Sequence, residues 1–355
     1  MKLFKQIAKF IGVLFLFIGL ITGTVIYSYI YIDKEIQTNT ITETKAKFGS
    51  FKDSEIIKKE KLNGFKYWVL ESSGIIFPKF KLLQNVDIYS IAYKSDGLII
   101  TGIMLTPKKE GIYPCIIYNR GGNRDAGRLN FRQIDKYMLP YANQGYVVIA
   151  SNYRGNSGSE GKEEFGGADV NDVMNLIPVL SKTSMADISK IGIFGHSRGG
   201  LMTYKAIKNK NIFKTAVVMA GSANEFISIR DRPEMEQFVY SEVIPNYYEN
   251  RDENLKDRSV VYWPEKLNKM PLLLLHGTKD KNVNYEEAKQ LVTKLDSLEF
   301  PYKFVSFEGD DHVLNNNRKE SVKIILDWFN KYLRNVEPYN ETQKQIIIND
   351  KTVYK

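Results

Sequence analysis

The stretch IGIFGHSRGG, Ile191–Gly200, places a serine between glycines directly after a short apolar run. Gly195, Ser197 and Gly199 fit the pattern G-x-S-x-G, in which the serine lies on a sharp turn between a strand and a helix. Small neighbours are needed there because the backbone is strained and bulky side chains would clash. A helical pattern follows the motif, so the stretch predicts a nucleophilic serine at the end of a buried strand.

Short apolar runs alternate with helical patterns on both sides of this motif. A hairpin pattern comes first, at 86–107, where VDIYSIAYKSDGLIITGIMLTP alternates around KSDG. The later runs are YPCIIYN, YVVIASNY, IGIFG, TAVVMAG, PLLLLHG and YKFVSF, and helical patterns lie at 131–144, 167–180, 201–208, 285–298 and 318–333. This alternation predicts an α/β fold with a mostly parallel central sheet flanked by helices and antiparallel strands at one edge.

One stretch, 223–263, interrupts the alternation and is rich in charge and tyrosine. Ligands in open α/β sheets bind outside the C-terminal ends of the strands. We therefore expect this stretch to be an insertion that covers that end of the sheet. Tyr240, Tyr247 and Tyr248 are candidate substrate-binding residues, and packing within the cover is an equally weighted alternative.

A serine hydroxyl needs an adjacent base to act as a nucleophile, and the chain has only three histidines. In α/β-hydrolases the acid and then the histidine follow the serine along the chain. His196 precedes Ser197, and His276 precedes the best-placed acid. His312, in EGDDHVL after the last predicted strand, is therefore the predicted base.

The acid is expected in the loop after PLLLLHG, where Asp280 lies in GTKDKNV. Asp310 and Asp311 are closer to His312 in sequence, but an orienting acid normally approaches from another loop. We therefore predict the catalytic triad Ser197, Asp280 and His312.

An oxyanion hole needs N–H donors directed at the developing negative charge. The backbone N–H of Arg198, the residue after the serine, is one predicted donor. The loop after YPCIIYN reads Arg120, Gly121, Gly122 and is the predicted source of the second.

Three arginines fall on loops that face the expected crevice: Arg120, Arg154 and Arg198. A guanidinium matches a carboxylate, so these residues could clamp an acidic substrate. The alternative is internal pairing, which is the interpretation we favour for Arg154. The acidic candidates for that pairing are Asp125, Glu160 and Asp169.

From about Val86 to Leu333 the chain resembles the catalytic domain of the prolyl oligopeptidase family of serine peptidases, family S9, within the α/β-hydrolase superfamily. Four stretches carry the resemblance: NYRGNSGSEGKEEFGGADVNDV, GHSRGGLMTYKA, RSVVYWPEKLNKMPLLLLHGTKDKNVNYEEAKQLVTKL and FEGDDHVLNNN. The resemblance implies a serine peptidase with the same triad. An esterase or deacetylase acting on acyl esters, and a tethered binding protein with a decayed site, are the alternatives. None of these requires a metal or an organic cofactor.

Two departures from the family pattern limit what the resemblance implies. Fewer than a hundred residues precede the resembling region, so the β-propeller that family members usually carry cannot fit there. Arg120 stands where the family often has a tyrosine beside the paired glycines. The second oxyanion donor is thus either a backbone N–H near Gly121 or Arg120 itself.

The N-terminus carries lysines at 2, 5 and 9 and then 23 uncharged residues, 10–32. Such a run is long enough to cross a bilayer of about 30 Å. We predict a cytoplasmic segment at 1–9 and a transmembrane anchor at 10–32, with a cleaved signal peptide as the alternative. A stalk or cover at 33–80, a hydrolase domain at 81–335 and a tail at 336–355 would then lie outside the cytoplasm, at the cell membrane.

Charge and cysteine content exclude other classes of function. The net charge is +9, but the basic residues are spread along the chain without a zinc-finger or RNA-binding signature. The single cysteine, Cys115, excludes an intrachain disulfide and multi-cysteine metal sites. It lies in an apolar run, which predicts a buried, inert thiol. The predicted partners are a peptide or ester substrate and membrane lipid, not nucleic acid.

Overall fold

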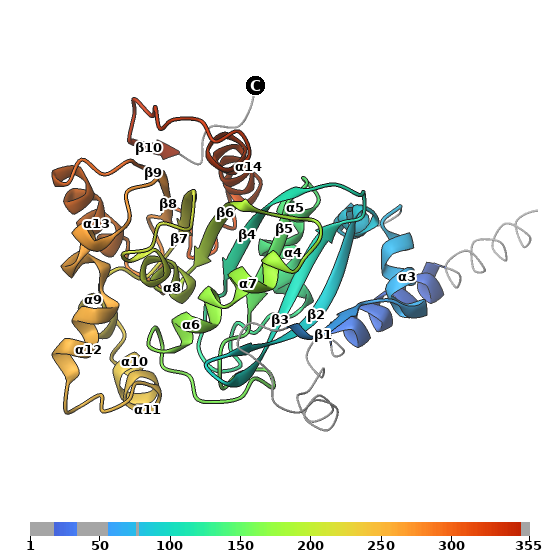
Figure 1. Ribbon diagram of the computed structural model, residues 1–355, viewed down its shortest axis with the longest axis horizontal. Helices are drawn as coiled ribbons and strands as arrows, with labels where there is room; N and C mark the ends of the chain where they lie inside the picture. The colour runs from blue at the N-terminus through green and yellow to red at the C-terminus, as the bar shows by residue number, and fades with distance from the viewer. Residues whose placement is uncertain (1–17, 34–55, 76–77, 349–355) are drawn as a thin grey trace, which may run out of the picture.

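The computed structural model describes residues 18–33, 56–75 and 78–348, which contain one ten-stranded sheet in the order β1-β2-β3-β5-β4-β6-β7-β8-β9-β10 (Figure 1). The strands are β1 (Ile56–Lys61), β2 (Val86–Ser95), β3 (Leu98–Pro107), β4 (Tyr113–Asn119), β5 (Val147–Ser151), β6 (Ala186–His196), β7 (Thr215–Met219), β8 (Leu272–Gly277), β9 (Tyr302–Phe307) and β10 (Gln345–Ile348). Strands β1, β2, β3 and β5 pair antiparallel, and every pairing from β5 to β10 is parallel. The predicted mostly parallel sheet with antiparallel strands at one edge is confirmed.

The strand order places a crevice at the carboxyl ends of β4 and β6. From β4 the chain passes outward to β5 and then returns to the opposite side of β4 as β6. The register pairs Ile117 of β4 with Ile149 of β5 and with Ile193 of β6. Connections that leave a strand in opposite directions open a ligand-binding crevice between its loops. The serine motif follows β6 at this position.

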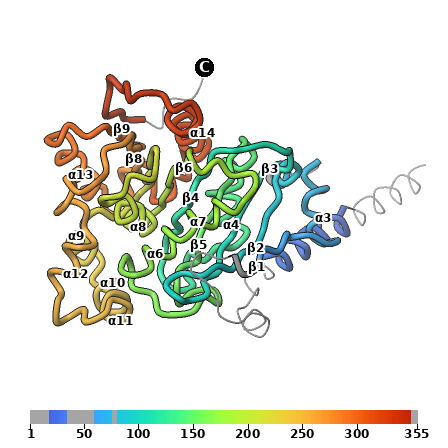
Figure 2. The backbone as a smooth tube through the Cα atoms, in the orientation of Figure 1, coloured from blue at the N-terminus to red at the C-terminus, as the bar shows by residue number. Residues whose placement is uncertain are grey.

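Helices cover both faces of the sheet (Figure 2). The α-helices are α3 (Gly64–Ser73), α4 (Phe131–Tyr137), α5 (Leu139–Ala142), α6 (Asp169–Met174), α7 (Leu176–Ser181), α8 (Arg198–Ile207), α9 (Glu225–Asp231), α10 (Pro233–Met235), α11 (Ser241–Val243), α12 (Arg251–Arg258), α13 (Tyr285–Ser297) and α14 (Arg318–Phe329). The 3₁₀ and π turns are η1 (Pro78–Asn85), η2 (Glu236–Tyr240), η3 (Val260–Tyr262), η4 (Pro264–Lys266) and η5 (Asn330–Arg334).

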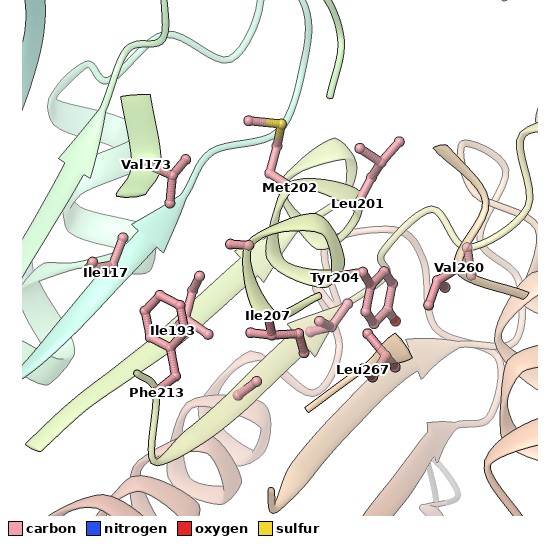
Figure 3. Packing of buried hydrophobic residues seen from close by; sticks show 14 of the residues in the cluster. Ile117, Val173, Ile193, Leu201, Met202, Tyr204, Ile207, Phe213, Val260 and Leu267 are labelled. Carbon is pink, nitrogen blue, oxygen red and sulfur yellow. The ribbon is translucent and has the colours of Figure 1, made fainter. Parts of the chain in front are cut away.

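Alternate residues of the central strands point into two separate cores, as the two-residue period of a strand requires. Ile117 and Ile193 face α6, α7, α8 and α13, where they pack with Met202 of α8 (Figure 3). Ile116 and Phe194 face the other side, where α4, α5 and α14 lie. Because both faces are buried, these strands appear in the sequence as continuous apolar runs.

The stretch between β7 and β8 is helical. It contains α9 to α12, which lie together at the end of the sheet away from α3 (Figures 1 and 2). Two further elements extend the sheet beyond the strands expected from the sequence. Strand β1 pairs with β2, within the predicted stalk or cover, and β10 pairs with β9, within the predicted tail.

Residues 18–33 form a helix that packs on the body near α3 (Figure 1). Val25, Ser28 and Ile32 are buried, and the ring of Tyr29 lies 5.4 Å from that of Phe131. The predicted transmembrane helix at 10–32 is not supported. No helix within the described residues is both long and apolar enough to span a bilayer, and one face of this one is buried against protein. Residues 10–17 of the segment lie outside the described residues.

Candidate active site

Ser197 occupies a strained turn between β6 and α8. Its φ of 59° and ψ of −129° lie in a region that residues with a side chain rarely adopt. A Cβ on Gly195 would lie 2.0 Å from the carbonyl oxygen of Gly199, and one on Gly199 would lie 1.9 Å from that of Asn119. Both contacts are far too short for a side chain. The two glycines are therefore required by the close packing of backbone around the serine.

His312 and Asp280 approach each other from different loops. Asp280 follows β8 and His312 follows β9, and His312 Nδ1 lies 2.7 Å from Asp280 Oδ2. The Asp280 side chain is fully buried and that of His312 is 12% exposed. Because a carboxylate only accepts, Nδ1 donates, and Nε2 of His312 is left as the basic nitrogen.

His196, the residue before the serine, joins the histidine loop to the serine turn. Its Nε2 lies 3.1 Å from the carbonyl oxygen of His312, and the two rings are 4.8 Å apart between centroids. Burial and the nearby His312 ring hold the pKa of His196 well below its usual value. The ring is therefore neutral with the proton on Nε2, and it donates to the loop that carries the base.

His276 was not predicted to belong to the site, but it contacts the candidate acid Asp280. Its Nε2 lies 3.1 Å from Asp280 Oδ2 and 3.0 Å from the Val283 carbonyl. Burial raises the pKa of Asp280, but hydrogen bonds from His276 and His312 more than offset it, so this pKa lies well below its usual value. His276 therefore fixes the acid as an ionised acceptor. The sequence feature that could have identified this contact is the position of His276, at the end of a predicted strand and four residues before Asp280.

The two acids next to His312 in sequence hold the loop and leave its ring to Asp280. Asp310 is buried and accepts from the backbone N–H of Asn317 at 3.0 Å. Asp311 accepts from that of Val313 at 3.0 Å. These side-chain bonds satisfy backbone N–H groups that have no partner in a helix or strand, and they fix the backbone conformation of the loop that carries His312.

The predicted oxyanion residues lie on both sides of the serine. Arg198 is the first residue of α8, so its backbone N–H is among those without an intrahelical acceptor. A Cβ on Gly121 would lie 2.9 Å from Ser197 Cβ, so this loop passes directly against the serine. Gly122 has a φ of 73°, and a Cβ there would lie 2.1 Å from the Ala126 carbonyl oxygen. The glycines therefore allow the loop its close approach.

The Arg120 side chain supports this loop from within. All five of its N–H groups are donated to backbone carbonyl oxygens, and the residue is fully buried. The acceptors are Gly121, Arg124, Ala126 and Asn152. Burial and the nearby Arg198 lower the pKa of Arg120 to about 10. The predicted roles of this side chain as a substrate clamp and as an oxyanion donor do not fit, because every donor is already bound.

The Arg198 side chain is also held internally. Its Nη2 lies 2.6 Å from Asp169 Oδ2, Nη1 pairs with Glu163, and Nη1 also donates to the Gly122 carbonyl at 3.0 Å. All three charged side chains are less than 5% exposed. For Arg198 the clamp and internal pairing were both open, and the structure shows internal pairing, with the candidate Asp169 as one partner. These bonds also tie α8 to the loop at Gly122.

Arg154 pairs internally too, as we favoured. Its guanidinium bonds Asp172 at 2.8 Å and Asp96 at 2.7 Å, neither of which was among the candidate partners. It therefore fixes the loop after β5 to α6 and the β2–β3 hairpin.

A cavity of about 80 Å³ opens beside Ser197. Its lining comes from the oxyanion loop, the serine turn and the helices between β7 and β8. The lining residues are Gly122, Asn123, Phe165, Ser197, Arg198, Ser222, Glu225, Ser228, Arg232, Met235, Tyr240 and Val283. Of the predicted tyrosines, Tyr240 lines the cavity, Tyr247 packs behind it at 6.1 Å between ring centroids, and Tyr248 is 68% exposed.

A parallel sheet with a strained serine, followed in chain order by an acid and a histidine, defines a serine hydrolase of the α/β-hydrolase type. The family model of the prolyl oligopeptidase family matches residues 131–336, and the chain belongs to this family.

Relatives and solved structures agree with this assignment. The chain is 33% identical over 234 residues to the uncharacterized peptidase YtmA of Bacillus subtilis, covering 61% of this chain and 83% of YtmA. It is 27% identical over 209 residues to YitV of the same organism, whose description proposes an esterase, covering 52% of this chain and 82% of YitV. The structure of Pyrococcus horikoshii acylaminoacyl peptidase matches with a TM-score of 0.65 at 23% identity, covering 76% of this chain and 45% of that one. This chain therefore spans less than half of that larger protein and shares its fold.

Proposed function

We propose that this serine hydrolase cleaves short peptides by two-step acyl transfer at Ser197. The observation that carries the proposal is the Asp280–His312 hydrogen bond of 2.7 Å, on loops that follow β8 and β9, two and three strands along the sheet from the strand β6 that leads into the serine turn. His312 Nε2 takes the proton of Ser197 as the hydroxyl oxygen attacks the substrate carbonyl. Asp280 orients the ring and stabilises its charged form.

The negative charge of the tetrahedral intermediate would be held by the backbone N–H of Arg198 and by the loop at Gly121 and Gly122. His312 then gives its proton to the leaving group, and the acyl group stays on the Ser197 oxygen. Water attacks this ester with His312 again acting as the base, which returns the free serine. Arg120 contributes through the shape of the loop.

The serine assignment is tested by labelling with a fluorophosphonate probe. We expect Ser197→Ala to abolish labelling while the circular dichroism spectrum and melting temperature stay close to those of the wild type. Ser189→Ala, an exposed serine of β6, is the matched control and should label fully. Persistent labelling of Ser197→Ala would exclude this residue as the nucleophile.

Peptides are the proposed substrates because YtmA, at 33% identity, is described as a peptidase. The esterase alternative is supported by the description of YitV. The two are separated with one acyl group on two leaving groups, an aminoacyl p-nitroanilide and the corresponding p-nitrophenyl ester. Turnover of the ester alone, with no amide cleavage at high enzyme concentration, would favour the esterase.

We also propose that the catalytic body lies outside the cytoplasm at the cell membrane and is attached through its N-terminal segment. The support for this proposal is the charge pattern of the sequence, three lysines followed by an uncharged run at 10–32; the described part of that run packs on the body in the structure. Fractionation of cells that express the full chain is the test, together with protease added to intact spheroplasts. Recovery in the soluble fraction, or protection from the protease, would contradict it.

A further inference from the structure

Arg232, directly after α9, lines the cavity beside Ser197. Its Nε is buried and has no hydrogen-bond partner, and its guanidinium forms no ion pair within the part of the chain that the structure describes. The other arginine of the cavity, Arg198, also has a buried Nε without a hydrogen-bond partner, but both of its Nη atoms are bound, to Glu163 and to Asp169. Buried donors are nearly always paired, so an unpaired one beside a nucleophile calls for a partner from outside the chain.

The carboxylates around the cavity already have their own donors. Glu225 accepts from the hydroxyls of Ser222, at 2.6 Å, and Tyr240, and its burial raises its pKa. Glu287 lies behind it and accepts from the backbone N–H groups of Ala223 at 2.9 Å and Asn224 at 3.0 Å.

Asp231, the residue before Arg232, is bound by a different arginine, Arg230, at 2.6 Å. None of these carboxylates accepts a hydrogen bond from Arg232. The Arg232 charge is near enough to Glu225 to lower the pKa of that carboxyl, against the larger effect of burial, but the guanidinium is not hydrogen-bonded to it. Its N–H groups therefore remain available in the cavity.

We propose that Arg232 binds a carboxylate of the substrate and so makes the enzyme selective for short acyl groups that end in a carboxylate. A guanidinium fork matches a carboxylate with two parallel hydrogen bonds. A water needs about 10–15 Å³ of such space, so a cavity of about 80 Å³ holds only a few non-hydrogen atoms. The acyl group stays bonded to Ser197 through both steps, so a cavity that begins at Ser197 suits it. This inference rests on the proposed function.

The test compares p-nitrophenyl hydrogen succinate with p-nitrophenyl 4-methylpentanoate, in which an isopropyl group replaces the carboxylate. A second pair places the charge on the leaving group, as the acetyl esters of 4-hydroxybenzoate and 4-hydroxybenzamide.

We expect the wild type to prefer the succinate ester to the neutral ester. Arg232→Gln should lower the ratio of kcat/KM for the succinate ester to kcat/KM for the neutral ester about 10- to 100-fold, as for a lost charged hydrogen bond. Arg232→Lys should restore part of this ratio. Arg230→Gln, an exposed neighbour already paired with Asp231, is the matched control and should leave the ratio unchanged.

A wild type without preference for either anionic ester would overturn the proposal, as would a loss in Arg232→Gln that is equal for charged and neutral esters. A preference confined to the leaving-group pair and lost in Arg232→Gln would retain carboxylate binding but overturn its assignment to the acyl group. Fluorophosphonate labelling separates this inference from the proposed function. If the wild type does not label, the hydrolytic mechanism fails; if it labels without anionic selectivity, only the role of Arg232 fails.

Discussion

Replacing Arg198 by methionine tests whether this arginine is a structural residue or a substrate clamp. The change removes one guanidinium that pairs with Glu163 and Asp169, whose side chains are 4% and 0% exposed. Leaving buried charges without their partner costs about 3–5 kcal/mol. The Gly122 carbonyl also loses its donor, so the oxyanion loop loses a constraint.

An unfolding entropy of about 2.1 cal/mol/K per residue gives about 0.75 kcal/mol/K for 355 residues, so this loss of stability corresponds to a fall in Tm of about 4–7 °C. The fall is measured by differential scanning fluorimetry at one scan rate. Arg230→Met is the control, because an exposed ion pair contributes at most about 1 kcal/mol. Adding Glu163→Gln and Asp169→Asn to Arg198→Met should recover part of the loss, since no buried charge is then unpaired. A Tm for Arg198→Met within about 2 °C of the wild type, with altered selectivity between acidic and neutral esters, would refute the structural role.

Three further tests concern the serine turn at Gly199, the acid Asp280 and the thiol of Cys115. Gly199→Ala would place a methyl group 1.9 Å from the Asn119 carbonyl oxygen and should lower Tm strongly. Gly97→Ala is the control: its methyl group meets no atom within 4 Å, so only the strain of its positive φ remains and Tm should fall little. The pKa of Asp280 is depressed in the folded protein, so its stabilisation is present above the unfolded pKa of about 3.9 and is lost as the pH falls below it. Urea unfolding should therefore show a loss in Asp280→Asn at pH 7 that shrinks toward pH 3. Burial raises the pKa of Cys115 to about 12, so this thiol should react with a disulfide reagent at pH 8 only after unfolding.

The order of elements along the chain was enough to predict the mostly parallel sheet and the proximity of Asp280 to His312. Strands that are buried on both faces appear in the sequence as apolar runs. The G-x-S-x-G turn joins a strand to a helix, so the apolar run before Ser197 was predicted to be a strand. The loops after β8 and β9 then meet because neighbouring parallel strands end at the same edge of the sheet. Asp280 and His312 are 32 residues apart in sequence and 2.7 Å apart in the structure for this reason.

The directions of loop side chains could not be predicted in the same way. Arg120 and Arg198 both lie on crevice loops, yet both guanidiniums turn inward, 4.8 and 5.1 Å from the ring centroid of Tyr153. For Arg198 the deciding partners are Asp169 and Glu163, 29 and 35 residues away in sequence. For Arg120 they are backbone carbonyl oxygens, among them that of Asn152, 32 residues away. Arg232 lies in the stretch without regular alternation, so no periodic pattern marked it as a cavity residue.

Two hydrogen-bond networks hold the candidate catalytic residues and the oxyanion loop in place. Arg232, the residue proposed to select the acyl group, belongs to neither network. On one side Arg120 and Arg198 fix the oxyanion loop, and on the other His276, Asp280, His312 and His196 form a chain that ends beside Ser197. Arg232 belongs to the helical stretch between β7 and β8, which lines the cavity. Other residues of this stretch support the neighbouring loops: Glu242 pairs with Arg124, and Arg258 donates to the Phe165 carbonyl. Because its guanidinium shares no ion pair with either network in the described residues, changes at this position can alter which acyl group is accepted while the nucleophile, base and acid keep their geometry. Selectivity in this protein is therefore expected to vary with the residue at position 232 independently of the hydrolytic groups.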